Sequence, residues 1–123
     1  MTASSAAELI RMFSRSFSAG DIDGLMELYE EDAVFPNHHG THKGAEQIRP
    51  VLQGYIDSGA KIEFNLQVSF ETGDIALVQN AWTLTTSGCD EVTGVSVEVA
   101  RRQSDGSWKY VIDSPDGAPL LGH

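Results

Sequence analysis

The sequence predicts an α+β fold in which a strongly bent antiparallel sheet wraps around three N-terminal helices to form a cone. Apolar residues recur at helical spacing only in the first half of the chain, up to residue 57. From residue 61 onward, strand patterns are joined by short turns. With 123 residues, of which 41% are hydrophobic, we expect one domain over 1–123, with a cavity at the wide end of the cone.

The first two predicted helices are marked by their capping residues. Ser5 and Glu8 form a capping box, and the apolar positions after them predict a helix from about Ala6 to Ala19. Gly20 ends this helix, and Asp21 caps the second one. The apolar stripe of the second helix consists of Ile22, Leu25, Met26 and Tyr29.

A short strand and a tight connection are expected next. Residues 33–35 have the pattern of a strand, which Pro36 halts. Residues 37–43 predict a loop or a minimal hairpin that turns at Gly40.

A third helix is predicted over residues 45–57, where apolar residues return to helical spacing. Pro50 lies inside this segment and removes one backbone hydrogen bond. We therefore expect a kink at Pro50 or a helix whose regular part begins near Arg49.

Two long strands are predicted to follow. Residues 61–71 alternate strictly between polar and apolar side chains, which predicts a half-buried antiparallel strand. Residues 75–86 begin as a continuous apolar run, so we expect this strand to be buried on both faces.

The last predicted unit is a hairpin. After a polar loop over 87–93, residues 95–113 contain two strand patterns around a turn at Asp105 and Gly106. Residues 114–123 contain two prolines and two glycines and predict an irregular tail.

Composition limits the classes of partner. Eighteen acidic and eight basic residues give a net charge of −10, which repels nucleic acids and anionic lipids, so we expect no nucleic-acid and no membrane partner. The first ten residues lack the pattern of a secretory leader, and no apolar stretch is long enough to span a bilayer. The single Cys89 excludes an internal disulfide. Together these features predict a cytoplasmic protein.

Glu98 is the first of two carboxylates in the otherwise apolar hairpin. It shares a strand face with Ser96 and Ala100, whose small side chains leave room for a ligand if this face lines the cavity. The alternative is a surface ion pair, which contributes little to stability. The candidate partners for such a pair are Arg101, Arg102 and Lys109.

Asp113 is the second carboxylate. Strand alternation groups it with Lys109 and Val111, away from Tyr110 and Ile112. It is a candidate pocket residue, and the alternative is a turn or cap before the chain breaks at Ser114-Pro115.

Three histidines, His38, His39 and His42, crowd into the connection before the third helix. Their spacing around Gly40 matches no recognised metal site, so we expect no metal. A general base is a better catalytic role, because imidazole titrates near neutral pH. Solvent-exposed loop residues are the alternative. The sequence favours His39 or His38 as the base without choosing between them.

Aromatic and amide side chains are candidates for a pocket wall. Asn80 and Trp82 share a strand face, where a buried amide must bond either a ligand or a neighbouring strand. Phe13, Tyr29 and Tyr55 could wall an apolar pocket or belong to an ordinary core. The sequence has no phosphate loop, nucleophile elbow, zinc-ligand spacing or nucleotide fingerprint, so we expect no cofactor.

Four stretches carry a family resemblance: FSAGDIDGLMELYEEDAVF at 17–35, GAEQI at 44–48, GDIALV at 73–78 and VEVARRQSDGSWKYVID at 97–113. With these motifs the chain resembles the ketosteroid-isomerase-like superfamily, which has the nuclear transport factor 2 cone fold. Within it, the chain is similar to small bacterial SnoaL-like proteins. The resemblance spans residues 9–113 and implies a fold more than an activity, because the superfamily includes isomerases, dehydratases, cyclases, hydrolases and binding domains.

The resemblance also implies that key positions of ketosteroid isomerase are changed here. Its hydrogen-bonding tyrosine falls on Phe13, which has no donor, and its general base falls on Asn37, which takes no proton at neutral pH. Its protonated acid falls on or near Glu98. In SnoaL-like enzymes an Asp or His near the end of the last strand commonly faces the cavity, which implies that Asp113 replaces the base. We therefore do not expect a steroid isomerase of the known mechanism.

Two functions follow from these expectations. One is a cofactor-independent acid–base isomerase, dehydratase or cyclase that acts on a small apolar compound, with Asp113, Glu98 and His39 moving protons. In this case Asn37 and His38 would help to bind the compound. The alternative is a non-catalytic domain that binds a ligand or dimerises. The resemblance implies a homodimer formed through the sheet, with the strand at 61–71 as the candidate surface.

Overall fold

The computed structural model describes residues 3–117, apart from the side chains of residues 66 and 67. It contains three helices and a six-stranded sheet. In chain order the elements are α1 (Ala6–Ala19), α2 (Ile22–Met26), β1 (Tyr29–Asn37), β2 (Gly40–Lys43), α3 (Gly44–Asp57), β3 (Lys61–Thr72), β4 (Ile75–Thr85), β5 (Val92–Arg102) and β6 (Trp108–Ser114). Of the expected tail, Ser114 still belongs to β6, and residues 118–123 lie outside the described part.

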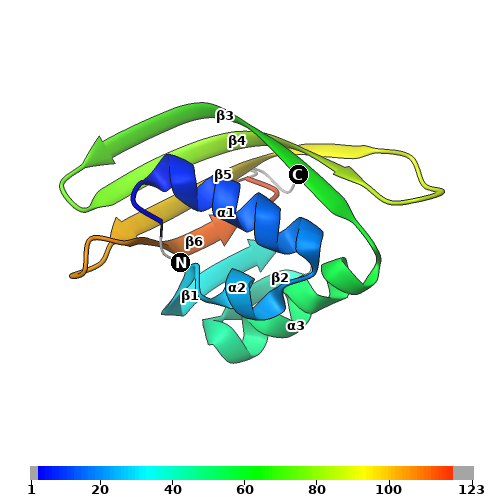
Figure 1. Cartoon of the computed structure of the whole chain (residues 1–123), viewed down its shortest axis with the longest axis horizontal. Coiled ribbons are helices and arrows are strands. Elements are labelled where there is room, and N and C mark those ends of the chain that lie inside the picture. Colours follow the sequence, from blue (N-terminus) through cyan, green and yellow to red (C-terminus); the bar gives the residue numbers. More distant parts are fainter. Residues whose placement is uncertain (1–2, 118–123) are drawn as a thin grey trace.

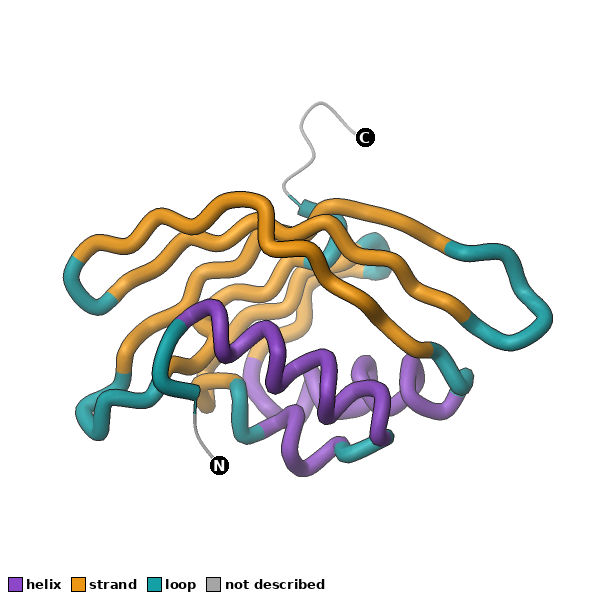
Figure 2. The backbone as a smooth tube through the Cα atoms, turned by 45° about the horizontal axis from the view of Figure 1, so that its top comes forward, coloured by secondary structure: helices purple, strands orange, loops and turns teal. Residues whose placement is uncertain are grey.

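The sheet bends over the three helices. Its strand order is β2-β1-β6-β5-β4-β3, and neighbouring strands are antiparallel except for the parallel pair β1 and β6. The long strands β3 and β4 arch over α1, and α2 and α3 lie on the same side of the sheet as α1 (Figures 1 and 2). The predicted α+β cone is confirmed, with the β1–β6 pair as a parallel departure from it.

Helix α1 begins and ends where the sequence predicts. The Ser5 hydroxyl accepts a hydrogen bond from the backbone N–H of Glu8 at 3.0 Å. Gly20 ends the helix in the left-handed conformation, with φ 72°, which glycine adopts without steric cost. The helix buries one apolar face against the sheet. This face of the helix consists of Ala6, Leu9, Ile10, Phe13 and Phe17.

Tyr29 does not extend the second helix as its spacing suggested. Helix α2 starts after Asp21 as predicted but ends at Met26, and Tyr29 begins β1. Its strand partner is Tyr110, whose backbone N–H donates to the carbonyl of Leu28 at 2.8 Å. Pairing with β6 therefore overrides the helical spacing at this position.

Strand β1 is longer than the predicted segment 33–35, and Pro36 does not halt it. The last residue pair between β1 and β6 is Val34–Ile112, so Pro36 lies where β1 is bordered by β2 alone. Proline has no backbone N–H, and at this edge no residue of β6 needs a hydrogen bond from it. The predicted minimal hairpin is present, but His38 and His39 form its turn and Gly40 begins β2.

Helix α3 runs through Pro50 and is helical from Gly44 onward. The expectation that the regular part of this helix begins near Arg49 is therefore wrong.

A β-bulge breaks the predicted alternation of β3. The pairs Leu66–Asn80 and Val68–Gln79 are not in one register, so one residue between them has no partner in β4. Beyond this bulge the faces exchange, and Phe70, predicted to be buried, is 67% exposed. The extra residue also bends the strand, which helps the sheet to curve over α1.

Strand β4 is buried on one face, not on both. Ala76, Val78 and Asn80 are buried, whereas Leu77 between them is 44% exposed. The helices cover only the concave face of the sheet, so the outer face of this apolar run has no cover within the described residues.

A second bulge changes the predicted orientation of Asp113. The predicted hairpin is present, although β5 begins at Val92, inside the segment predicted as a loop. Val99 pairs with Ile112 but Ala100 pairs with Tyr110, which leaves Val111 without a partner in β5. Asp113 is consequently buried on the same face as Tyr110, and not grouped with Val111 as strict alternation predicted.

Candidate functional site

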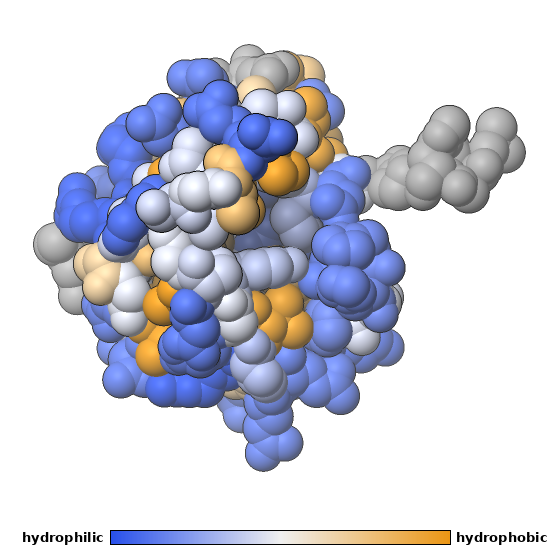
Figure 3. All heavy atoms as spheres, turned by 90° about the vertical axis from the view of Figure 1, so that its right-hand side faces the viewer, coloured by the Kyte–Doolittle hydropathy of each residue, from blue (hydrophilic) through white to orange (hydrophobic). Residues whose placement is uncertain are grey.

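A cavity of about 230 Å³ lies between the concave face of the sheet and helices α1 and α3. Figure 3 views the end of the molecule that lies on the right in Figure 1, where hydrophobic side chains surround a hollow. Most of the cavity wall is aliphatic or aromatic. The aromatic residues at its centre and mouth include Phe13, Phe17, Phe35, Tyr55, Phe64 and Trp82.

Glu98 and Asp113 are the two buried carboxyl groups in this wall. They are directly opposite each other on β5 and β6 and are only 3% and 6% exposed. Side chains at opposite positions of antiparallel strands have Cβ atoms about 5 Å apart, so the two groups interact electrostatically. The expected surface alternative for Glu98 is not realised, because Arg101 pairs with Glu30 and Arg102 with Asp74 on the exterior.

Each carboxyl group is held by one neutral side chain behind the wall. The Asn80 Nδ2 atom donates to Glu98 Oε1 at 2.7 Å. The Tyr29 hydroxyl donates to Asp113 Oδ2 at 2.5 Å. These hydrogen bonds fix the positions of both carboxyl groups. Each bond engages one carboxyl oxygen and does not involve the second oxygen of the same group.

Burial raises the pKa of both groups. For Glu98, loss of solvation and the charge of Asp113 raise the pKa to about 8, against the opposing effects of the nearby Ser96 hydroxyl and of the Asn80 hydrogen bond. For Asp113, loss of solvation raises the pKa to about 6, against the hydrogen bond from Tyr29. At neutral pH the two interacting carboxyl groups therefore hold about one proton between them.

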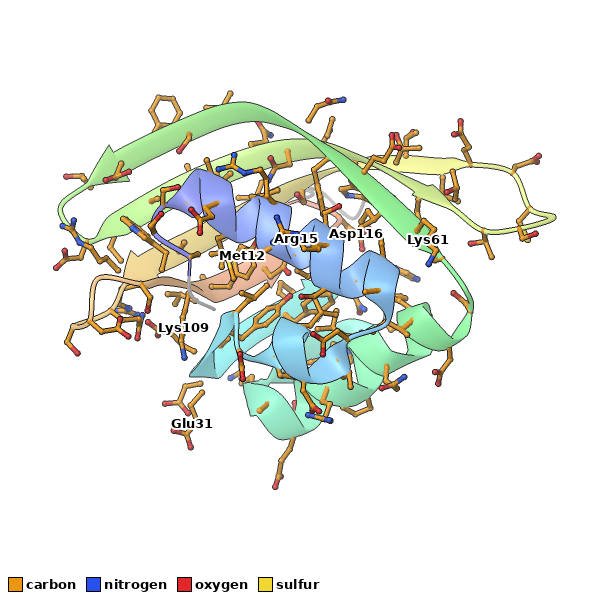
Figure 4. The ribbon with its side chains drawn as sticks, viewed as in Figure 1. Met12, Arg15, Glu31, Lys61, Lys109 and Asp116 are labelled. Atoms are coloured by element: carbon orange, nitrogen blue, oxygen red, sulfur yellow. The ribbon has the colours of Figure 1, made fainter. Side chains whose placement is uncertain are left out.

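A network of hydrogen bonds surrounds the cavity mouth. The Nδ1 atom of His38 lies 3.4 Å from Asp116 Oδ2, and the backbone N–H of His38 donates to the same oxygen at 3.1 Å. The Trp82 indole N–H donates to the carbonyl of Pro115 at 2.7 Å. These contacts tie the segment after β6 to the β1–β2 turn and to β4. Figure 4 labels Asp116.

The structure brings part of the predicted site together. The predicted residues in the cavity wall are Asp113, Glu98, His38, Phe13, Tyr55 and Trp82.

The other predicted residues lie outside that wall. Tyr29 and Asn80 stand behind the carboxyl pair, and Asn37 donates its amide N–H to the Tyr55 hydroxyl at 3.1 Å. His39 is exposed in the β1–β2 turn, with its ring centroid 4.0 Å from that of His38.

Sequence analysis missed Tyr110, Pro115 and Asp116 in the cavity wall. Strict strand alternation predicts Tyr110 on the face opposite Asp113, and only the bulge at Val111 brings the two side chains to the same face. Nothing in the sequence marks that bulge. Pro115 and Asp116 were assigned to the irregular tail, although the Asx-forming residues of that segment signal a turn.

Residues 3–117 contain no group of three or more His, Cys, Asp or Glu side chains that could hold a metal ion. Within the same part of the chain, no helix is long and apolar enough to cross a membrane.

Residues 10–111 match the family described as the SnoaL-like domain. The chain belongs to the SnoaL-like domain family. No curated protein matches the sequence. The family match names no active-site residue. The match therefore does not imply the buried carboxyl pair or the apolar wall, which are seen in the structure of this SnoaL-like chain.

Solved structures share this SnoaL-like fold at low sequence identity. A protein of unknown function with a cystatin-like fold from Nostoc punctiforme is 17% identical, with a TM-score of 0.80, and the alignment covers 99% of this chain and 98% of that one. A ketosteroid isomerase-like protein from Erwinia carotovora atroseptica is 17% identical, with a TM-score of 0.71 and coverage of 88% and 89%. An NTF2-like protein of unknown function from Pseudomonas putida is 18% identical, with a TM-score of 0.75 and coverage of 95% and 86%. These likenesses show the fold alone.

Proposed function

We propose that this protein is a cofactor-independent acid–base enzyme that moves a proton on a small apolar molecule held in the cavity. The observation that carries the proposal is the buried pair of Glu98 and Asp113, which lie opposite each other on β5 and β6 in the cavity wall. A carboxylate beside a carboxylic acid supplies a general base and a general acid at the same moment. The apolar wall supports the choice of an apolar ligand.

The roles of the two groups follow from their environments. Asp113, ionised and oriented by Tyr29, is the base that takes a proton from a carbon next to a carbonyl group. The electrons of the broken C–H bond form an enolate, whose oxygen accepts a hydrogen bond from the acid proton of Glu98. Asp113 then returns its proton to another carbon of the same molecule, and the carbonyl re-forms. The net reaction is an isomerisation. If the enolate instead expels a β-hydroxyl group, which leaves as water with the proton returned by Asp113, the carbonyl re-forms beside a new C=C bond and the net reaction is a dehydration.

His39 is not part of this scheme, because it is exposed in the turn. His38 lines the cavity, where its backbone N–H and its ring Nδ1 both contact Asp116 Oδ2. We assign it to ligand access.

The proposal is tested with 3-cyclohexenone, a small ketone whose double bond moves into conjugation when one proton is transferred. Conversion is followed by the rise in ultraviolet absorbance, and deuterium uptake from heavy water is measured by mass spectrometry. We expect Asp113→Asn to lower kcat by about 100-fold or more. The matched control Asp74→Asn removes an exposed carboxylate that pairs with Arg102 and should leave kcat unchanged. Conversion and deuterium uptake that are no faster than in buffer would contradict the proposal.

A homodimer formed through the outer face of the sheet is a second proposal, and it fits the alternative of a non-catalytic binding domain as well. Phe70, Leu77, Val99 and Ile112 are consecutive cross-strand partners and form an apolar row across β3 to β6. Phe70, Leu77 and Ile112 are 67%, 44% and 38% exposed. Large exposed apolar side chains in one row are typical of an interaction surface.

Sedimentation tests the dimer. Leu77→Asp places a charge in the centre of the row and should give a monomer. Thr85→Asp, at an exposed position of the same strand, is the control and should sediment like the unaltered protein. A monomeric unaltered protein would contradict the proposal.

A further inference from the structure

The cavity wall contains acidic groups and the His38 ring at its mouth, but no lysine or arginine. All eight basic residues lie elsewhere: seven are exposed, and Lys109 is half-buried at the start of β6, away from the cavity. Figure 4 shows Lys61 and Lys109 at opposite ends of the molecule and Arg15 on α1. Arg49, Arg101 and Arg102 are paired with carboxylates on the exterior. An anion beside the carboxyl pair would therefore meet no lysine or arginine side chain.

Tyr110 offers a hydrogen-bond donor that the proposed proton transfer does not use. It is 2% exposed, lines the cavity and is a strand partner of Ala100, next to the Glu98–Asp113 pair. Its hydroxyl has no hydrogen bond with any other described side chain, and burial together with the charges of Glu98 and Asp113 raises its pKa. Because Tyr110 lines the cavity, its hydroxyl can donate a hydrogen bond to an acceptor atom of a ligand held there. The edge of its ring contacts Phe13, with centroids 6.3 Å apart, which orients the phenol.

We infer that the cavity takes an uncharged apolar compound with one acceptor oxygen at its inner end, bonded by Tyr110, and that it excludes carboxylates and phosphates. The inference rests on the proposed function only in that the ligand occupies this cavity; it does not require turnover.

The exclusion follows from the cost of bringing two like charges together out of water. An anionic ligand loses its hydration on entering the apolar wall, and it then lies beside the Asp113 carboxylate with no compensating cation. An uncharged ketone of the same shape loses far less hydration. Its oxygen gains a hydrogen bond from Tyr110 that water cannot supply inside the cavity.

The inference is tested with three ligands that share one benzene ring: acetophenone, cumene and benzoate. Cumene has the shape of acetophenone without the oxygen, and benzoate has a charge in its place. An apolar cavity of roughly 150 Å³ holds benzene, so a cavity of about 230 Å³ has room for these compounds. Titration calorimetry on the full chain at pH 7 should show acetophenone binding about tenfold more tightly than cumene, and benzoate about 100-fold or more weakly than acetophenone.

Variants separate the two parts of the inference. Tyr110→Phe should remove the preference for acetophenone over cumene and leave cumene affinity unchanged. Asp113→Asn should strengthen benzoate binding at least about tenfold, whereas Asp74→Asn, which changes the net charge equally on the exterior, should not. If Asp113→Asn does not fold, the unaltered protein tests the same point, because protonation of Asp113 below its pKa of about 6 should strengthen benzoate binding.

Each result decides the inference. Benzoate binding as tight as acetophenone binding overturns the charge exclusion, and equal affinities for acetophenone and cumene overturn the role of Tyr110. Binding of none of the three overturns the inference as a whole. Binding in the expected order without any proton transfer overturns the proposed enzyme and leaves this inference standing.

Discussion

Glu98 and Asp113 face each other across β5 and β6 on the inner face of the sheet, because Val111 bulges out of the pairing between Asp113 and Tyr110. Without that extra residue, Asp113 and Tyr110 would lie on opposite faces. The bulge therefore brings Asp113 and Tyr110 together with Glu98 in the wall of one apolar cavity. Bulges commonly re-aim side chains next to active sites.

The first prediction concerns the pH dependence of activity. The proposed base must be ionised and the proposed acid protonated, so kcat/KM should rise with an apparent pKa of about 6 and fall with one of about 8. The two values belong to the interacting pair and not to isolated residues. Glu98→Gln keeps a donor without a titrating proton, so it should remove the alkaline fall. A profile that is flat between pH 5 and 9 would count against this carboxyl pair as the catalytic groups.

The second prediction concerns the pH dependence of stability. In the folded chain the pKa rises from 3.8 to about 6 for Asp113 and from 4.5 to about 8 for Glu98. At pH values between the ordinary and the raised pKa of each group, the folded state therefore binds more protons than the unfolded state. The free energy of unfolding should therefore fall as pH rises through this range. The expected loss is roughly 5 kcal/mol between pH 5 and pH 8.5.

Glu98→Gln isolates the share of one group in that loss. Because glutamine does not ionise, the free energy of unfolding of this variant should fall less steeply over the same range. Urea unfolding at several pH values measures both slopes. Parallel slopes for the variant and the unaltered protein would show that Glu98 titrates in the fold as it does in the unfolded chain.

The third prediction concerns Tyr29, a positioning residue behind the wall. Its hydroxyl donates to the Asp113 carboxylate, so Tyr29→Phe removes a bond that favours the ionised form. The pKa of Asp113 should rise further, and the acid limb of the rate profile should move to higher pH. The loss of stability at pH 7 should be about 1 to 3 kcal/mol. Carbon NMR titration of the Asp113 carboxyl group measures the shift without any substrate, and an unmoved or lowered pKa would refute the role of this hydrogen bond.

The general plan of the fold could be predicted from the sequence because its signals are local. Ser5, Gly20 and Asp21 mark helix ends through hydrogen bonds to their own neighbours. The hairpin at Asp105 and Gly106 is likewise fixed by its turn residues. In contrast, the family resemblance pointed to Glu98 without showing which face it occupies.

The orientation of the site could not be predicted, because it depends on registers between strands. One extra residue in β3 turns Phe70 outward, and one in β6 turns Asp113 inward. Both bulges arise from how the whole sheet curves over α1, and an alternating pattern in one strand contains no information about that curvature. The exposure of Leu77 was missed for a related reason, since an apolar run does not show which of its faces the helices cover.

The fourth prediction concerns Gly94, the partner of Trp82 on the neighbouring strand. A Cβ atom at Gly94 would lie 2.6 Å from Cε2 of the indole, which is too close for any van der Waals contact. Gly94→Ala should therefore displace Trp82 from the cavity wall and break its hydrogen bond to Pro115. We expect a loss of about 1 to 3 kcal/mol in stability and a red shift of tryptophan fluorescence in a Trp108→Phe background, where only Trp82 emits.

Gly54→Ala is the matched control for this change. Gly54 lies within α3, and a Cβ atom there would meet no other atom within 4 Å. Replacement of an unconstrained helical glycine by alanine should stabilise the protein by about 0.5 to 1 kcal/mol and leave the fluorescence unchanged. Because the two variants add the same methyl group, a difference between them isolates the close approach of Trp82. If the Gly94→Ala and Gly54→Ala variants have equal stabilities and equal fluorescence spectra, a methyl group at position 94 does not displace Trp82, and Gly94 does not determine the shape of the cavity mouth.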